Sequence, residues 1–183
     1  MIFSSSCATF GSPRQFPITE QSPQRPTNPY GMAKLQAEHA IIAFLQAQQR
    51  AGAPFSAALL RYFNVIGADP AGRIGPHLRH DANKKYPRIV DAAYDVALGL
   101  RPKLAVMGSS FPTADGSAQR DYIHVSDLAT AHVQALEYIA HGNKDITVNL
   151  GTSNGLSVLD ILEATKRLSG VDFQVEMGPR RAG

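Results

Sequence analysis

The chain has 183 residues, 44% of them hydrophobic, and a formal net charge of +3. This length and apolar content are typical of a globular protein with one hydrophobic core. No apolar run is long enough to span a membrane, and basic residues do not alternate with aromatic ones in a stripe, so we expect neither membrane nor nucleic-acid partners. Cys7 is the only cysteine, which excludes an internal disulfide bond and a cysteine metal cage and favours a cytoplasmic setting.

A long helix is predicted after a proline-rich loop near the start of the chain. Residues 12–29 contain five prolines and many polar side chains, which predicts a surface loop. Thr27 or Asn28 can cap the helix, and Pro29 suits its first turn. Apolar residues then recur at helical spacing until Gly52-Ala53-Pro54, so the helix is expected over about 29–51.

The rest of the chain alternates between predicted strands and helices. Ser126 and Ser157 are expected to cap two of the helices, and Gly170 to end the second of them. Such alternation favours an α/β fold with a doubly wound parallel sheet. The other predicted elements are strands at 1–3, 55–62, 104–107, 120–125, 146–150 and 173–177, helices at 89–100, 126–140 and 157–169, and a loop at 69–85.

Tyr30 and Lys34 form the most informative pair for chemistry. They are four residues apart on the predicted helix, so both side chains should lie on one face. A lysine charge beside a phenol favours the phenolate, and such a tyrosine can act as a base near neutral pH. A short pair of this kind occurs by chance, and the stretches around it decide its meaning.

Several stretches of the chain, taken in order, resemble those of the UDP-sugar 4-epimerases of the extended short-chain dehydrogenase/reductase superfamily, typified by UDP-glucose 4-epimerase. The resemblance covers essentially the whole chain. The stretches are Phe3-Ser4-Ser5-Ser6-Cys7-Ala8-Thr9-Phe10-Gly11, Asn28-Pro29-Tyr30-Gly31-Met32-Ala33-Lys34, Leu60-Arg61-Tyr62-Phe63-Asn64-Val65-Ile66-Gly67, Arg120-Asp121-Tyr122-Ile123-His124-Val125-Ser126-Asp127-Leu128 and Pro179-Arg180-Arg181-Ala182-Gly183.

This resemblance implies NAD-dependent epimerisation at C4 of a UDP-sugar through a 4-keto intermediate, with UDP-glucose and UDP-galactose as the substrates. It implies that Tyr30 is the catalytic base, and that Lys34 holds the nicotinamide ribose and tunes the phenol. Ser6 would hydrogen-bond the 4-hydroxyl and relay its proton. The full-length enzyme is expected to be a homodimer that serves galactose metabolism.

The resemblance also assigns the contacts to cofactor and substrate. Phe63 would border the nicotinamide, and Ser4 and Ser5 are candidates for cofactor contact, although a serine run after a strand also satisfies backbone groups at a turn. Asn64 would donate to the diphosphate, and the strand containing Ala105, Val106 and Met107 would meet the uracil with its backbone. Arg120 and Arg181 would bind the diphosphate, because guanidinium groups bind phosphates bidentately.

Some residues depart from the pattern or have an ordinary interpretation. Arg88-Ile89-Val90-Asp91 replaces a segment that begins with Asn in many relatives, and Gly72-Arg73-Ile74-Gly75 is followed by Pro76 where the family has Glu. Both changes bear on which sugar is used. His77 and His80 have a spacing that suits a metal, but solvated loop histidines are the expected reading, so no metal is predicted. No motif in the sequence pairs Cys7 with a base, so it is expected to be a small packed residue rather than a nucleophile.

Two related enzyme classes and a second sugar pair are alternatives. Nucleotide-sugar 4,6-dehydratases and UDP-glucuronate decarboxylases share the Tyr-x-x-x-Lys core but place acidic residues just after the catalytic serine or threonine. Cys7 and Ala8 occupy those places here, which favours simple epimerisation. Residues 64–70 resemble the UDP-arabinose/UDP-xylose branch slightly more than the glucose/galactose branch.

The start of the chain lacks the strand, glycine-rich turn and helix that receive the cofactor pyrophosphate in such folds. We therefore expect an N-terminally truncated chain, with 1–63 as the second half of the NAD-binding domain. Residues 64–183 would mainly bind the UDP-sugar, with 120–150 returning to the Rossmann-like sheet. The alternative to an enzyme is an inactive remnant that lacks the pyrophosphate site.

Overall fold

The computed structural model describes all residues except 54, 76–87, 143 and 181–183. The described residues fall into two compact units. Unit 1 comprises residues 1–65 and 122–153, and unit 2 comprises residues 66–121 and 154–182. The predicted division into a cofactor domain and a sugar-nucleotide domain stays a prediction. None of the helices in this described part combines the length and apolar character that a membrane span requires.

Unit 1 is built on a parallel sheet. Its strands β1 (Ile2–Ser6), β2 (Ala58–Tyr62) and β6 (Ile146–Leu150) lie in the order β1–β2–β6. Both neighbouring pairs are parallel, and in the first pair Ser6 lies opposite Tyr62. All three strands therefore end at the same edge of the sheet.

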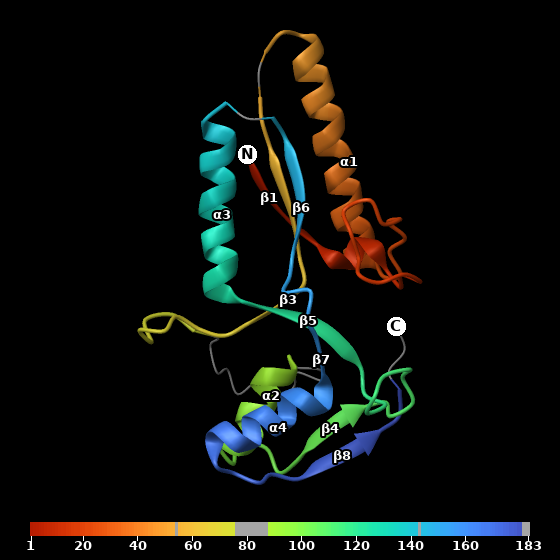
Figure 1. Cartoon of the computed structure of the whole chain (residues 1–183), viewed down its shortest axis with the longest axis vertical. Coiled ribbons are helices and arrows are strands. Elements are labelled where there is room, and N and C mark those ends of the chain that lie inside the picture. The colour runs from red at the N-terminus through yellow and green to blue at the C-terminus, as the bar shows by residue number, and fades with distance from the viewer. Residues whose placement is uncertain (54, 76–87, 143, 181–183) are drawn as a thin grey trace. The chain divides into compact units, whose positions relative to one another are not determined.

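The helices α1 (Pro29–Arg50) and α3 (Val125–Ala140) cover opposite faces of this sheet. The Ser4 hydroxyl contacts His132 of α3, whereas the Ser5 hydroxyl donates to Glu38 of α1. Successive residues of a strand point to opposite faces, so the two helices lie on different sides of β1. Figure 1 shows the strands of unit 1 between α1 and α3. The doubly wound parallel arrangement predicted from the sequence is confirmed.

A buried ion pair joins α1 to the sheet. The side chains of Glu38 and Arg61 are 1% and 6% exposed, and the Arg61 Nη2 atom lies 2.6 Å from the Glu38 Oε2 atom. Arg61 Nε donates to the same carboxylate at 2.9 and 3.2 Å. Ser5 Oγ donates to Oε1, and Gln24 Nε2 donates to Oε2 at 3.0 Å. We call the side chains of Ser5, Gln24, Glu38 and Arg61 the Glu38 cluster.

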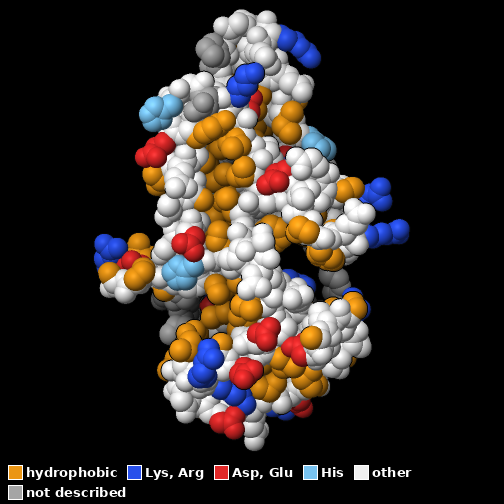
Figure 2. Space-filling model, in the orientation of Figure 1, with side chains coloured by type: hydrophobic (Ala, Val, Ile, Leu, Met, Phe, Trp, Pro, Cys, Tyr) orange, Lys and Arg blue, Asp and Glu red, His pale blue; other side chains and the backbone are white. Residues whose placement is uncertain are grey.

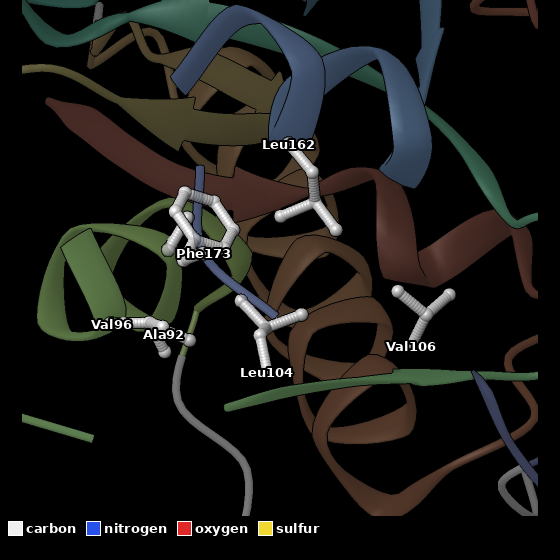
Figure 3. Close-up of a cluster of buried hydrophobic side chains, with 7 residues drawn as sticks. Ala92, Val96, Leu104, Val106, Leu162 and Phe173 are labelled. Atoms are coloured by element: carbon white, nitrogen blue, oxygen red, sulfur yellow. The ribbon is translucent and has the colours of Figure 1, made fainter. Parts of the chain in front are cut away.

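Unit 2 contains a two-stranded parallel sheet with two helices. Strand β4 (Leu104–Met107) pairs with β8 (Val175–Gly178), and α2 (Ile89–Ala97) packs on α4 (Val158–Ser169). Buried side chains from α2, β4 and α4 converge on Phe173 (Figure 3). This core consists of Ala92, Ala93, Val96, Leu104, Val106, Leu162 and Phe173.

Three short elements were not predicted from the sequence. Strand β7 (Gly155–Ser157) pairs antiparallel with β5 (Gln119–His124), and β3 (Asn64–Ile66) completes the order β3–β5–β7. A 3-10 helix, η1 (Cys7–Phe10), follows β1. Elements of three or four residues are too short for hydrophobic periodicity to show.

The helix caps agree with the sequence in two cases and differ in one. Asn28 accepts a hydrogen bond from Gly31 N, and Ser157 forms a capping box with Asp160. The prediction that Ser126 caps α3 is wrong. The ring of His124 accepts a hydrogen bond from Ser126 N at 3.1 Å, because β5 runs directly into the helix and the cap position falls two residues earlier.

Two expectations about loops have different outcomes. The turn interpretation of Ser4 and Ser5 is wrong, because both lie inside β1, where their backbone groups pair with β2. Residues 12–28 form the predicted loop without helix or strand. Residues 69–75 also lack regular structure, and the remainder of the predicted 69–85 loop, with His77 and His80, lies outside the described residues.

Hydrophobic side chains also lie on the surface of unit 1. Val133 and Leu136 of α3 are 56% and 54% exposed. Figure 2 shows hydrophobic side chains gathered on the viewed face along α3 and the strands beside it. Exposed apolar surface of this kind favours association between molecules.

The Glu38 cluster should make the stability of the fold sensitive to acid. Burial raises the pKa of Glu38, but hydrogen bonds from Arg61, Ser5 and Gln24 and the charge of Arg61 outweigh it, so the pKa lies below its ordinary value of 4.5. The unfolded chain then binds a proton at a higher pH than the folded chain. Stability is therefore fully present above pH 4.5 and is lost as pH falls through the folded pKa.

We predict that the free energy of unfolding falls more steeply below pH 4.5 in the native chain than in Glu38→Gln, which cannot titrate. At neutral pH the variant should be less stable, by up to about 3–5 kcal/mol, because Arg61 then lacks its countercharge. Urea unfolding at a series of pH values measures both. Equal acid dependence in the two proteins would show that protonation of Glu38 does not cause the loss of stability.

Candidate active site

Tyr30 and Lys34 lie together in the first turns of α1. The Asn28 cap and Pro29 at the first helical position fix the start of the helix. Tyr30 is 56% exposed, and the Lys34 Nζ atom lies 5.8 Å from the centre of its ring. This places the ammonium beside the phenol, as the four-residue spacing predicts.

Lys34 is tied to β1 through a backbone group. Its Nζ atom donates to the carbonyl oxygen of Ser4 at 2.7 Å and also lies 5.2 Å from the ring centre of Phe3. An ammonium has three donors, so Lys34 keeps donors for a ligand after making this bond. The half-buried lysine is thus oriented by β1 and remains able to bind hydroxyl groups.

Ser4 and His132 form a second polar contact on the α3 side of β1. The His132 Nδ1 atom lies 2.8 Å from the carbonyl oxygen of Leu128, which can only accept. In a neutral imidazole this nitrogen carries the hydrogen, so Nε2 accepts from Ser4 Oγ at 3.4 Å. The Ser4 hydroxyl points toward α3 and is occupied there.

Ser6 is the last residue of β1 and caps η1. Its Oγ atom accepts a hydrogen bond from Ala8 N at 3.2 Å, and its carbonyl accepts one from Thr9 Oγ1 at 3.0 Å. The Ala8 bond uses Ser6 Oγ as an acceptor, and this hydroxyl donates to no other group among the described residues, so its hydrogen stays available to a ligand. Ser6 is thus held in place at the edge of the sheet with one donor to spare.

A close contact brings the start of α1 against η1. A Cβ atom built on Gly31 would lie 2.4 Å from the carbonyl oxygen of Ala8 and 3.0 Å from Pro26 Cβ. Only glycine permits this approach. Gly31 follows Tyr30 directly and Ala8 is two residues after Ser6, so the contact joins the segments that carry these two side chains.

Phe63 and Asn64 follow the end of β2. Ser6 pairs with Tyr62, so Phe63 stands one residue beyond the end of β1 at the same edge. Its backbone N–H donates to Leu150 O at 3.1 Å. Asn64 is exposed. In open parallel sheets ligands bind at this carboxyl edge, and the binding roles of Ser6, Phe63 and Asn64 stay predictions.

The strand predicted to meet the uracil and the predicted diphosphate ligand Arg120 belong to unit 2, whereas Asn64 belongs to unit 1. Val106 is 1% exposed and its side chain lies in the core, whereas Ala105 is exposed and Met107 is half-buried. Arg120 is exposed on β5, and its Nη1 atom donates to Gln119 O at 2.7 Å. Arg181 lies outside the described residues.

Strands β4 and β8 end side by side. Met107 pairs with Gly178, and Gly108 N donates to Gly178 O at 3.0 Å. Beyond this point the Arg180 guanidinium lies 4.4 Å from the ring centre of Phe111. The parallel pairing therefore brings the end of the Ala105–Met107 strand beside the segment that leads into the paired arginines.

Comparison with known proteins gives one consistent result. The sequence profile of the NAD dependent epimerase/dehydratase family matches residues 1–151. The chain belongs to this family. Over its whole length it is 46% identical to a probable UDP-arabinose 4-epimerase 1 of Oryza sativa subsp. japonica, covering 42% of that protein. It is 45% identical to a UDP-glucose 4-epimerase of Lacticaseibacillus casei, covering 52% of it.

Solved structures of family members agree with the fold. A UDP-glucose 4-epimerase of Brucella ovis in complex with NAD is 43% identical, with a TM-score of 0.87 over 100% of this chain and 53% of that one. A UDP-glucose-4-epimerase of Stenotrophomonas maltophila with bound NAD and formylated UDP-arabinopyranose is 36% identical, with a TM-score of 0.89 over 100% and 52%. The chain spans about half the length of the relatives that it matches.

Sequence reasoning missed the buried ion pair between Glu38 and Arg61 and the contact of His132 with Ser4. Glu38 lies four residues after Lys34 on α1, and Arg61 interrupts the apolar run of β2. A charged residue inside a buried strand is a signal that a partner is buried with it. His132 gave no such signal, because it lies on a helix where polar and apolar residues are interspersed. Among the described residues, no group of three His, Cys, Asp or Glu side chains could hold a metal ion.

We predict that Gly31→Ala destabilises the fold by about 1–3 kcal/mol, although alanine is the better helix former. The added methyl group would force α1 away from the carbonyl of Ala8. Gly75→Ala is the matched control, since among the described residues a Cβ there meets only Ala68 Cβ, at 3.3 Å. Urea unfolding compares the two, and a Gly31→Ala variant as stable as the control would refute the close approach.

Proposed function

We propose that this chain carries the proton-transfer residues and the sugar-nucleotide site of a UDP-sugar 4-epimerase. The observation that carries the proposal is the placement of an exposed Tyr30 beside the oriented ammonium of Lys34. Membership in the NAD dependent epimerase/dehydratase family supports it. UDP-glucose and UDP-galactose are the proposed substrates.

Tyr30 would accept the proton of the sugar 4-hydroxyl. It would return this proton after the bound 4-keto sugar has rotated to present its other face. The ammonium of Lys34 lies beside the phenol ring, and its hydrogen bond to Ser4 O keeps it in place. Ser6 would donate its free hydroxyl hydrogen to the same sugar oxygen and so orient it toward Tyr30. Removal of the proton in this geometry is general base catalysis.

The residues of unit 1 fit the nicotinamide end of NAD. Lys34 retains donors for ribose hydroxyls, and Phe63 at the carboxyl edge offers an apolar ring to the nicotinamide. NAD, when bound, would take the hydride from C4 and give it back on the other face. Ser4 and Ser5 would contribute no hydroxyl to the cofactor, since their hydroxyls bond to His132 and Glu38.

The substrate diphosphate would be bound by Asn64, Arg120 and Arg181, and the uracil by the backbone of Ala105, Val106 and Met107. Guanidinium groups suit a diphosphate because they donate two hydrogen bonds in parallel. Unit 1 would then serve the cofactor and unit 2 mainly the UDP-sugar. A homodimer in the cytoplasm is part of this proposal, in keeping with a sequence that has Cys7 as its only cysteine.

UDP-arabinose and UDP-xylose form the second candidate substrate pair. The rice relative named as a probable UDP-arabinose 4-epimerase is as similar to this chain as the relative named as a UDP-glucose 4-epimerase. Interconversion of both sugar pairs, with NAD supplied, tests the choice. Residues 1–183 contain no glycine-rich phosphate turn, so the assay includes the chain joined to the remaining part of the Lacticaseibacillus casei relative. Turnover by neither protein would refute the proposed activity.

We predict that Tyr30→Phe lowers kcat about 10²–10⁴-fold in the protein that turns over UDP-sugar, because the general base is lost. The affinity for UDP should not change, since the phenol does not contact the nucleotide. Tyr138→Phe, an exposed tyrosine on α3, is the control. Retention of full turnover would remove Tyr30 from the mechanism.

Arg120→Ala should weaken UDP binding about tenfold or more, because a charged hydrogen bond to the diphosphate is lost in ground and transition states alike. Arg167→Ala changes an exposed arginine of α4 by the same chemistry and should leave binding unchanged. Calorimetric titration with UDP measures both. Equal affinities in the two variants would contradict the role of Arg120.

A further inference from the structure

The Glu38 cluster has no part in the proposed proton transfer, yet it adjoins the residues that do. Its carboxylate receives hydrogen bonds from Arg61, Ser5 and Gln24, and in the described structure no donor or acceptor of Glu38 is left unpaired. Ser5 directly precedes Ser6 on β1, and Glu38 lies one helical turn after Lys34 on α1. The cluster therefore joins the two elements that carry the site.

We propose that Glu38 is a positioning residue. Through Ser5 and Arg61 it fixes α1 against β1, and so sets the place of the proton-transfer side chains relative to the sugar. This inference rests on the proposed 4-epimerase function. It assigns Glu38 no contact with substrate or cofactor.

Two contacts, one turn apart, attach α1 to β1. Lys34 bonds to the carbonyl of Ser4, and Glu38 bonds to the hydroxyl of Ser5. A single contact would let the helix pivot, whereas two contacts on successive strand residues fix both its position along its axis and its rotation. One residue of helical slip corresponds to about 1.5 Å. A misplacement of about 1 Å can cost 10²-fold in rate.

Arg61 makes the attachment rigid from the side of β2. It lies opposite Ser5 in the parallel register, and its Nε and Nη2 atoms hold the carboxylate in a fork. Its Nη1 atom donates to Glu20 O at 3.3 Å, and Gln24 donates to Glu38. The loop that leads into α1 is thereby hydrogen-bonded to both members of the ion pair, to Arg61 through Glu20 and to Glu38 through Gln24.

The chemistry of the cluster favours a geometric role over a purely stabilising one. Replacement of a buried ion pair by apolar side chains of similar volume is often neutral or stabilising. Apolar contacts are non-directional, whereas these hydrogen bonds prescribe distances and angles. A pair kept for stability alone could be exchanged for apolar residues without loss of turnover.

The first test is Ser5→Ala, which leaves the Glu38–Arg61 pair intact and removes its link to β1. We expect kcat to fall about tenfold or more, with the affinity for UDP-sugar unchanged, because only the alignment of reacting groups is affected. Thr165→Val is the matched control, since Thr165 loses a buried hydroxyl whose bond at 2.8 Å stays within its own helix. Its kcat should match that of the native protein.

The second test is the double variant Glu38→Leu with Arg61→Met. We expect it to fold with a Tm at or near that of the native protein and still to lose at least about tenfold in kcat. Full kcat in this folded variant, or in Ser5→Ala, would overturn the inference. If the double variant fails to fold, the kcat and the UDP-sugar affinity of Ser5→Ala alone decide whether Glu38 has a positioning role.

The outcomes separate this inference from the proposed function. Native protein that interconverts UDP-sugars, with Ser5→Ala equally fast, would leave the function standing and remove the positioning role. Native protein without epimerase activity in either form of the assay would overturn the proposed function and this inference together. A loss of kcat in Ser5→Ala that is accompanied by an equal loss of UDP-sugar affinity would also count against it.

Discussion

A carboxylate that is 1% exposed cannot remain charged unless its partners are fixed as firmly as it is. Glu38 satisfies this condition by accepting hydrogen bonds from β1, β2 and the loop before α1. The helix can then adopt only one register on the sheet. Everything at its first turn, including the phenol of Tyr30, inherits its place from this buried charge.

The parallel sheet of unit 1 supplies the second constraint. Because β1, β2 and β6 run in the same direction, their carboxyl ends meet at one edge, and Ser6 and Phe63 are brought together without any contact between their side chains being required. Gly31 completes the corner by letting α1 approach Ala8 within a distance that no other residue permits. Backbone geometry thus brings the segments of the candidate site together, and few side-chain contacts between these segments are needed.

Local signals in the sequence predicted the regular elements well. Asn28-Pro29, Ser157 and Gly170 marked helix ends because capping depends on neighbouring residues alone. The Glu38 cluster was not predicted, because it joins residues up to 56 positions apart on four segments, and no local pattern encodes such pairing. The turn interpretation of Ser4 and Ser5 failed for the same reason, since their hydroxyls bond to side chains on distant helices.

The relatives named for UDP-arabinose and for UDP-glucose are almost equally similar to this chain, and the chemistry explains why. Both reactions invert the same carbon, C4, so Tyr30, Lys34 and Ser6 would serve either sugar without change. The two sugars differ at C5, where the hexose carries a hydroxymethyl group. A group of that size changes binding by only about 1–3 kcal/mol in a pocket. Sugar choice therefore depends on a few side chains facing C5, and it can change while the Glu38 cluster and the proton-transfer residues stay the same.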